Sequence, residues 1–321
     1  MSHFQELFPG VYLLQGVVGG RPLRLPLLVG AQRALLLDTG CAPDVQGFIL
    51  PALRELDLAP NRLGLIINTH CDLDHTGGNH GLKQLAPQAL LCCGDADRQQ
   101  IENPQAMFAL RYDAYRRDHD LYYEGDARDW IIASLGQAQP VDLTLRGGER
   151  LCLGPDWEVE VLHLPGHSRG HLGILDRKHR ALYGGDAIHG AQIPDLEGKP
   201  ALGPTYLHVD QYLDTIRFIE NLDLDYYVGC HWPVKRGAEI AAFCAESRNY
   251  VDQAERVIIE ALAAPRTLKE LCLSVGPKLG PWPAAVNSEH CYAFGGHLQR
   301  LQNQGRIADL GGTPRHYQAQ P

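Results

Sequence analysis

The sequence predicts an α/β fold, because short apolar runs that suit β-strands alternate with longer segments of helical periodicity. At 321 residues, with 45% hydrophobic and 21% charged residues, the chain is long enough for one large domain followed by a small one. This composition excludes a disordered, coiled-coil or collagen-like chain. The net charge of -9 argues against a protein that coats nucleic acid.

Strands are predicted where short apolar runs are bounded by Gly and Pro residues. They fall at residues 11–14, 25–29, 34–37, 63–67, 89–92, 141–145, 149–153, 157–163, 171–175, 181–184 and 226–229. Helices are predicted at 44–58, with Asp44 as the cap, and at 79–85, 209–222 and 237–264. The alternation of the two types is strongest in the first 90 residues.

The large domain is predicted to span residues 1–264, with a polar helical insertion at 95–137. Aromatic residues in this insertion suit either a lid over a site or ordinary core spacing, and both readings stay open; they are Phe108, Tyr112, Tyr115, Tyr122, Tyr123 and Trp130. Pro265 is predicted to end the large domain. Residues 265–321 then form a small segment of two or three helices and a β element.

Four possible metal ligands fall within six residues directly after the strand at 63–67: His70, Asp72, Asp74 and His75. A turn at the end of a rigid strand can direct alternate side chains to one site, and imidazole and carboxylate suit Zn, Fe or Mn. A polar surface loop is the simpler alternative. The density of ligands, followed by Gly77 and Gly78, favours the metal site.

Three further residues share this placement after an apolar run and a glycine: His167, Asp186 and His231. With these positions the chain resembles the metallo-β-lactamase-fold superfamily, whose mark is H-x-H-x-D-H followed by single His, Asp and His ligands. The resemblance covers residues 4–264. It implies a four-layer αββα sandwich, in which two mixed sheets pack face to face with helices outside.

The resemblance also implies a site with two divalent metal ions. It assigns His70, Asp72 and His167 to one ion, Asp74, His75 and His231 to the other, and Asp186 to a bridge between them. Asp38 matches an early Asp-Thr-Gly turn that supports the ligands, and His171 matches a strand histidine beside the site.

The sequence departs from the family pattern at Asp72, where His is common. A carboxylate adds a negative charge and a hard oxygen, so the metal preference is expected to move from Zn towards Fe or Mn, although Zn accepts carboxylate oxygen. The flavodiiron branch, with Glu at this position, is a precedent for an acidic residue. The alternative is that Asp72 does not coordinate and the protein holds one metal.

The expected chemistry is hydrolysis. Two metals about 3.5–4 Å apart can lower the pKa of a shared water and polarise a substrate oxygen, so a bridging hydroxide would be the nucleophile. Asp74 is the expected catalytic residue, which orients or relays the proton. His189, Tyr115 and Tyr122 are candidates for substrate binding, with a surface position equally open for His189. Cys71 and Cys230 are expected to pack in the core.

The resemblance implies a small-molecule ester, thioester or lactone as the preferred substrate. Two alternatives stay open: a nuclease or phosphodiesterase that binds nucleic acid through the C-terminal residues, and an iron-dependent enzyme that oxidises thiols. Residues 265–321 resemble a small winged-helix-like domain. Their six basic and three acidic residues are a weak basic excess, which favours packing or a homodimer over nucleic-acid binding.

A reducing cytoplasm is the expected compartment. The nine cysteines are an odd number without a C-x-x-C pair, and the first residues lack the pattern of a signal peptide. No apolar run approaches the length of a membrane span, so no membrane partner is expected.

Overall fold

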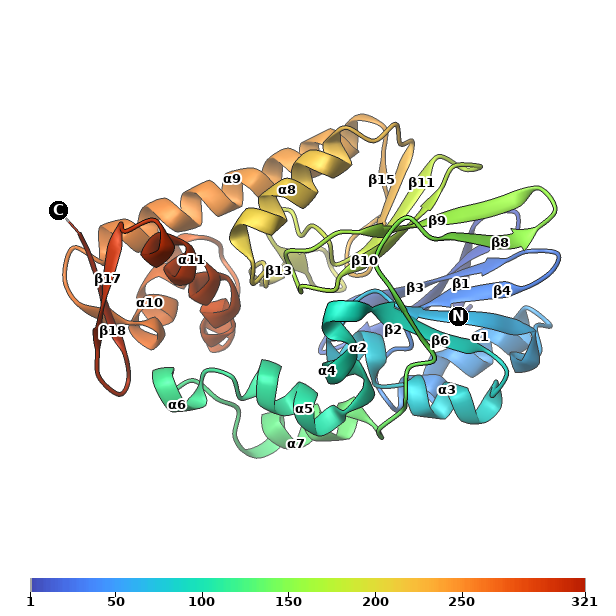
Figure 1. Ribbon diagram of the computed structural model, residues 1–321, viewed down its shortest axis with the longest axis horizontal. Helices are drawn as coiled ribbons and strands as arrows, with labels where there is room; N and C mark the ends of the chain where they lie inside the picture. The colour runs from blue at the N-terminus through green and yellow to red at the C-terminus, as the bar shows by residue number, and fades with distance from the viewer. Residues whose placement is uncertain (1, 321) are drawn as a thin grey trace.

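The computed structural model describes residues 2–320 and has four layers in the order helix, sheet, sheet, helix (Figure 1). The two sheets pack face to face, and helices cover both outer faces. The predicted α/β fold and its four-layer sandwich are therefore confirmed.

The first sheet has seven strands in the order of the chain. They are β1 (Phe4–Phe8), β2 (Val11–Val18), β3 (Arg21–Val29), β4 (Ala34–Leu37), β5 (Leu63–Asn68), β6 (Leu90–Gly94) and β7 (Leu143–Leu145). Neighbours are antiparallel from β1 to β4 and parallel from β4 to β7. Because β4, β5 and β6 run parallel, their carboxyl ends meet at one edge of the sheet.

The second sheet has six strands in the order β15-β14-β11-β10-β9-β8. They are β8 (Arg150–Gly154), β9 (Trp157–His163), β10 (Leu172–Asp176), β11 (Ala181–Gly185), β14 (Tyr226–Gly229) and β15 (Lys235–Arg236). Strands β11 and β14 are parallel, so their carboxyl ends also share an edge. A two-stranded ribbon of β12 (Ile193–Pro194) and β13 (Pro200–Leu202) follows β11.

The side chains of the central strands alternate between two hydrophobic cores, because successive residues of a strand face opposite sides of the sheet. In β4, Leu35 and Leu37 lie in the core between the two sheets, whereas Ala34 and Leu36 lie under the outer helices. The strands of such a sheet are buried on both faces, which explains their nearly continuous apolar sequences.

The outer helices cover opposite sides of the sandwich (Figure 1). Beside the first sheet lie α1 (Leu50–Glu55), α2 (Leu73–Thr76) and α3 (Asn79–Leu85), and beside the second lie α8 (Val209–Glu220) and α9 (Ala238–Ala261). A short helical segment, Val45–Ile49, precedes α1. The predicted role of Asp44 as a helix cap is wrong, because its side chain accepts from the backbone N–H of Cys41 and makes no capping bond to the helix.

The inserted segment, residues 95–137, connects β6 to β7 and is helical. It contains α4 (Arg98–Glu102), α5 (Pro104–Met107), a helical segment at Phe108–Tyr112, α6 (Arg116–His119) and α7 (Gly125–Leu135). Its α6 region lies beside the C-terminal segment, residues 266–319 (Figure 1). Ion pairs connect the two: Lys269 with Asp120, and Arg315 with Asp118.

The C-terminal segment has the two main helices and the β element that the sequence predicts. They are α10 (Leu268–Val275), α11 (Cys291–Asn303) and a sheet of β16 (Arg266–Thr267), β18 (His316–Ala319) and β17 (Ile307–Gly311). A tighter 3₁₀ helix, Ala284–His290, comes directly before α11. A reciprocal pair of bonds between Thr267 and Glu270 caps α10.

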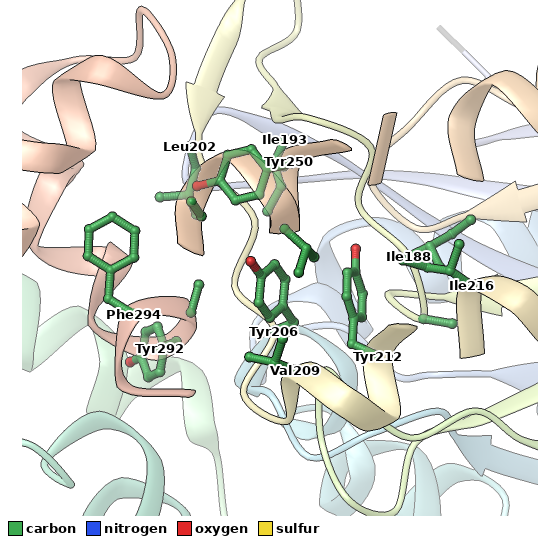
Figure 2. Close-up of a cluster of buried hydrophobic side chains, with 14 of the residues drawn as sticks. Ile188, Ile193, Leu202, Tyr206, Val209, Tyr212, Ile216, Tyr250, Tyr292 and Phe294 are labelled. Atoms are coloured by element: carbon green, nitrogen blue, oxygen red, sulfur yellow. The ribbon is translucent and has the colours of Figure 1, made fainter. Parts of the chain in front are cut away.

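The C-terminal segment shares one hydrophobic core with α8 and α9 (Figure 2). The rings of Tyr206 and Tyr212 stack with their centroids 4.4 Å apart, and Tyr250, Tyr292 and Phe294 are buried in the same cluster. Aromatic side chains bury large areas, so this cluster firmly attaches the segment to the sandwich. None of the helices among residues 2–320 has the length and apolar character that a membrane span requires.

Glu255 of α9 adds a charged attachment to the C-terminal segment. Its carboxylate accepts bonds from Arg300 at 2.5 Å and Arg306 at 2.6 Å. The neighbouring His297 and the two arginines lower the pKa of Glu255 from 4.5 to about 2. A depressed carboxylate pKa means that the stabilisation is present above pH 4.5 and is lost as the pH falls towards 2.

We therefore expect Glu255→Gln to lower the free energy of unfolding by about 1–2 kcal/mol at neutral pH, allowing for partial solvent screening. The difference from wild type should shrink as the pH falls from 5 to 3, as measured by denaturant unfolding at each pH. Glu260→Gln, on an exposed position of the same helix, is the control and should change little. A penalty for Glu255→Gln that is independent of pH would contradict the ionic explanation.

Candidate metal centre and cavity

The seven sequence-predicted ligands come together where the strand ends of both sheets meet. His70 and Asp72 lie in the loop after β5, and Asp74 and His75 lie in the short helix α2 that follows. His167, Asp186 and His231 come from the loops after β9, β11 and β14 of the second sheet. All seven side chains are buried or nearly so.

The ligand atoms on the Asp72 side lie close together. Asp72 Oδ2 is 3.1 Å from His167 Nε2 and 3.8 Å from His70 Nε2. Atoms that each lie about 2.0–2.2 Å from a common cation are about 3.3–3.6 Å apart in ideal tetrahedral geometry, so the two distances are close to those of a metal site.

The Asp186 side has the same spacing. His231 Nε2 is 3.3 Å from Asp186 Oδ2 and 3.4 Å from Asp74 Oδ2, and His75 Nε2 is 3.7 Å from Asp74 Oδ2. His75 Nε2 is also 3.9 Å from Asp186 Oδ2. The structure thus brings the predicted ligands into two adjoining groups.

The second ring nitrogen of three histidines is anchored away from the centre. His75 Nδ1 lies 2.8 Å from Asp38 Oδ2, His231 Nδ1 lies 2.7 Å from the carbonyl of Pro22, and His70 Nδ1 lies 3.0 Å from Thr69 Oγ1. Such contacts fix the ring orientation and leave Nε2 for a metal.

Asp38 positions the ligand loop through more than its contact with His75. Its carboxylate also accepts from the backbone N–H of Thr69 at 2.7 Å and from the Thr69 hydroxyl at 2.8 Å. Asp38 adopts a left-handed backbone conformation with φ of 62°. Asp tolerates this conformation better than most residues, which suits it to the turn after β4.

Two further residues position the ligands of the second sheet. Asp97, at the start of the inserted segment, accepts from the hydroxyl of Ser168 and from the N–H of Gly170, which flank the His167 loop. Burial lowers the pKa of His171 well below its usual range, so this ring is neutral. His171 Nε2 accepts from the backbone N–H of Asp186 at 3.2 Å.

The electrostatics of the centre favour a bound cation. Burial opposes a charge on His75, but Asp38, Asp74 and Asp186 raise its pKa to about 10. Although burial opposes its charge, His231 and other histidines keep the pKa of Asp186 well below the usual range. Asp186 is therefore ionised, and the negative charge that raises the pKa of His75 would equally attract a metal cation.

The donor set fits divalent metal ions. His70 Nε2, His75 Nε2, Asp72 Oδ1 and Asp186 Oδ1 are buried without a hydrogen-bond partner among residues 2–320. Buried polar atoms normally have partners, so orphaned donors and acceptors in one cluster indicate a ligand. Four imidazoles and three carboxylates are ligands that Zn, Fe and Mn accept.

His189 is fully buried beside the centre. Its backbone N–H donates to the Tyr212 hydroxyl at 2.8 Å, and its ring centroid lies 4.9 Å from that of His167. The surface position left open for His189 is therefore wrong. Cys71 packs in the first-sheet core, as the sequence suggests. Cys230 lies near His75, Asp186 and His231, but its thiol donates to the carbonyl of Arg24.

A cavity of about 490 Å³ opens onto the metal ligands. Asp72, Asp74, Asp186 and His231 lie in its wall. Apolar side chains form much of the remainder, from all parts of the chain: Val18, Leu73, Trp130, Ile131, Ile193, Leu202 and Val286. Sites for small molecules are commonly apolar with a few placed polar groups, and this cavity matches that description.

The substrate-binding tyrosines that the sequence suggests lie elsewhere. Tyr115 packs against Tyr292 and Gly295 of the C-terminal segment, with the two tyrosine rings 6.0 Å apart. Tyr122 is exposed and lies under the guanidinium of Arg116. From the same inserted segment, Tyr112, Tyr123 and Trp130 line the cavity instead.

Sequence reasoning missed the charged residues of the cavity. Arg111 is buried beside Asp72, and its Nη2 donates to Asp72 Oδ2 at 2.8 Å. Glu289, from the C-terminal segment, accepts from the Tyr123 hydroxyl at 2.6 Å, and burial raises its pKa. Arg21 lines the cavity from β3. Nothing local in the sequence distinguishes these residues from solvated charges.

Comparison with known families gives one family match. The model of the metallo-beta-lactamase superfamily matches residues 27–231, which is more than half of the chain and includes all seven candidate ligands. Among solved structures, a metallo-beta-lactamase family protein of Thermus thermophilus superposes with a TM-score of 0.76 at 22% identity. The match covers 98% of this chain and 100% of that one, and it shows a shared fold.

The matches to curated relatives cover smaller parts of the chain. Acyl-coenzyme A thioesterase MBLAC2 of Gallus gallus is 28% identical over 197 residues, which are 55% of this chain and 61% of that protein. Hydroxyacylglutathione hydrolase GloC of Haemophilus influenzae is 26% identical over 144 residues, 44% of this chain and 55% of that protein. The chain therefore spans less than two thirds of either relative.

The contacts of Asp38 lead to a prediction about metal binding. Asp38→Asn keeps the shape of the side chain but weakens its bond to His75, so metal affinity should fall about 10- to 100-fold. The measurement is competition for Zn²⁺ against a chromophoric chelator. Asp176→Asn is the matched control, because Asp176 is also buried and bonds His179, but at the far end of β10. Equal metal affinity in both variants would refute the positioning role of Asp38.

Proposed function

The chain belongs to the metallo-beta-lactamase superfamily, and from this premise we propose that it hydrolyses small-molecule thioesters with the help of two divalent metal ions. The observation that carries the proposal is the position of the ligand cluster at the wall of a cavity with a largely apolar surface. A substrate in that cavity lies directly against the candidate metal ligands.

Two kinds of relative support the thioester bond as the target. One is an acyl-coenzyme A thioesterase and the other a hydroxyacylglutathione hydrolase, and both substrates join an acyl group to a thiol. Because the two relatives share the thioester bond but not the thiol carrier, the proposal for this chain specifies the bond and leaves the carrier open. Esters and lactones are the related substrates against which the thioester preference is tested.

Each metal would be held by residues that the structure brings together. His70, Asp72 and His167 form one group, and Asp74, His75 and His231 form the other, with Asp186 between them. Bound divalent ions supply a water of lowered pKa and polarise the carbonyl oxygen of a substrate. Zn, Fe and Mn all suit this donor set.

The chain's own residues supply the remaining functions. Asp74 lies in the cavity wall and near His231, where it can hold the proton of the attacking water. Trp130 and Ile131 form an apolar wall suited to an acyl chain. Arg21 lines the same cavity and favours a substrate with an anionic group on its thiol part.

The test uses the full chain loaded separately with Zn²⁺, Mn²⁺ and Fe²⁺. Acyl-coenzyme A and hydroxyacylglutathione substrates are followed by the release of free thiol. We expect metal-dependent release that a chelator abolishes and that exceeds hydrolysis of a matched ester and a lactone. Absence of thiol release with every metal, or release that survives complete metal removal, would overturn the proposal.

Asp74→Asn tests the proton role. Because the amide cannot accept a proton, kcat should fall about 100-fold or more. Elemental analysis of the same preparation must show that the metal content is retained, which separates chemistry from ligation. Full turnover with unchanged metal content would show that Asp74 has no proton role.

Trp130→Ala tests the apolar wall. Removal of the indole should raise KM for a long-chain acyl thioester about tenfold, while KM for the acetyl thioester changes little, because only the long chain reaches that wall. Tyr122→Ala is the matched aromatic control from the same segment, exposed and outside the cavity wall. A rise in KM for Tyr122→Ala alone would support the sequence-based assignment of Tyr122 instead.

A further inference from the structure

Arg111 is a buried cation in the candidate metal centre. It lies in the helical segment Phe108–Tyr112 of the inserted segment and is 4% exposed. Its Nη2 donates to Asp72 Oδ2 at 2.8 Å. Charged side chains are rarely buried to this degree unless they are paired, so the role of Arg111 is inferred from its pairing with Asp72.

Tyr292 contacts Arg111 and is itself linked to Tyr123 and Glu289. Its guanidinium lies over the ring of Tyr292, 4.2 Å from the centroid. The Tyr292 hydroxyl lies 3.1 Å from that of Tyr123, which donates to Glu289. Cation–π contact in a desolvated site is favourable, so the C-terminal segment fixes the cation beside the metal ligands.

Asp72 can bond Arg111 and still bind a cation. Oδ2 receives the bond from Arg111 and is also the oxygen that faces the other candidate ligands, 3.1 Å from His167 Nε2 and 3.8 Å from His70 Nε2. Oδ1 is buried and has no hydrogen-bond partner among residues 2–320. An ionised carboxylate offers about four lone-pair positions on its two oxygens, so one guanidinium bond does not use them all. The ion pair therefore leaves Asp72 able to act as a metal ligand.

The charge of the centre depends on this pair. Asp72, Asp74 and Asp186 bring three negative charges, and Arg111 offsets one of them. Repulsion between a guanidinium and a divalent ion a few ångströms away is strong at low dielectric. The pair has no net charge, so in electrostatic terms it is equivalent to a neutral imidazole at position 72.

We propose that Arg111 is the residue that sets the charge, and thereby the metal affinity, of the Asp72 side of the metal centre. The negative charge of Asp72 is expected to tighten cation binding and to make the bound metal a weaker Lewis acid. Arg111 offsets that charge. The oxygen donor of Asp72 remains. This inference rests on the proposed metal site but not on the identity of the substrate.

The test measures metal affinity in four full-length, metal-stripped proteins: wild type, Arg111→Met, Asp72→His, and the double variant. Zn²⁺ and Mn²⁺ compete with a chromophoric chelator, and elemental analysis gives the stoichiometry. Arg111→Met should bind the more weakly held ion about tenfold or more tightly, because a repulsive charge is lost. Structural damage alone does not tighten binding.

The other two proteins complete the cycle. In Asp72→His the Arg111 charge lies beside three imidazoles and no carboxylate offsets it. This variant should therefore bind the metal ion about tenfold or more weakly than wild type. The double variant again has a neutral donor and no cation, and its affinity should return to within about threefold of wild type. Recovery on addition of a second substitution is the signature of charge compensation.

Two further variants control for the fold and for the loss of any arginine. Arg128→Met removes an arginine of the same segment that lies over Phe108 and has no contact with Asp72, and it should leave affinity unchanged. Arg111→Lys keeps the charge and should stay within about threefold of wild type. Thermal unfolding of the metal-free proteins verifies that each is folded, and Arg111→Gln replaces Arg111→Met if that variant is not.

Unchanged or weaker metal binding in a folded Arg111→Met protein would overturn the inference, as would a double variant no better than Asp72→His. A wild-type chain that binds no metal would overturn both this inference and the proposed function. Tight metal binding with the expected cycle, but no thioester hydrolysis, would leave the inference standing and refute the proposed function alone.

Discussion

Three hydrogen bonds to the carboxylate of Asp38 connect the strand ends on which the candidate metal centre depends. Asp38 follows β4, and through Thr69 and His75 it holds the loop after the neighbouring parallel strand β5. That loop and α2 carry four of the seven candidate ligands. The remaining three come from the second sheet, so the centre also requires the apolar core that presses the two sheets together. The geometry of the candidate metal centre thus depends on the packing of the whole sandwich.

The sequence was sufficient for the central strands and for placing the candidate ligands in the loops and the short helix after strand ends, because local sequence patterns specify both. The strands at 34–37, 157–163 and 226–229 have the predicted bounds, and each candidate ligand lies at or just after a strand end. Edge elements were missed. Strand β1 and the two-residue strands β12 and β15 carry little apolar signal, since their pairing is set by neighbours distant in sequence.

The cavity could not be predicted in the same way, because its wall depends on where the helices of the inserted segment begin and end. A continuous helix would have kept Tyr115 and Tyr122 on a regular face. Asp120, in a left-handed backbone conformation, instead ends α6, and α7 begins only at Gly125, which is also left-handed. Trp130 then lines the cavity, whereas Tyr122 lies outside its wall. Spacing along a sequence predicts a shared face only while the helix continues.

The C-terminal segment shows why a basic excess is weak evidence for nucleic-acid binding. Four of its six basic residues are in ion pairs with carboxylates, and in each case at least one partner lies outside the segment: Lys269 with Asp120, Arg300 with Asp210 and Glu255, Arg306 with Glu255, and Arg315 with Asp118 and Asp309. These charges attach the segment to α9, α8 and the inserted segment and do not form an open basic face. The attachment has a consequence for chemistry, because the attached segment supplies Glu289 and Tyr292 to the cavity. Since Tyr292 also holds Arg111 against Asp72, the packing of the C-terminal segment and the charge of the metal centre are parts of one arrangement.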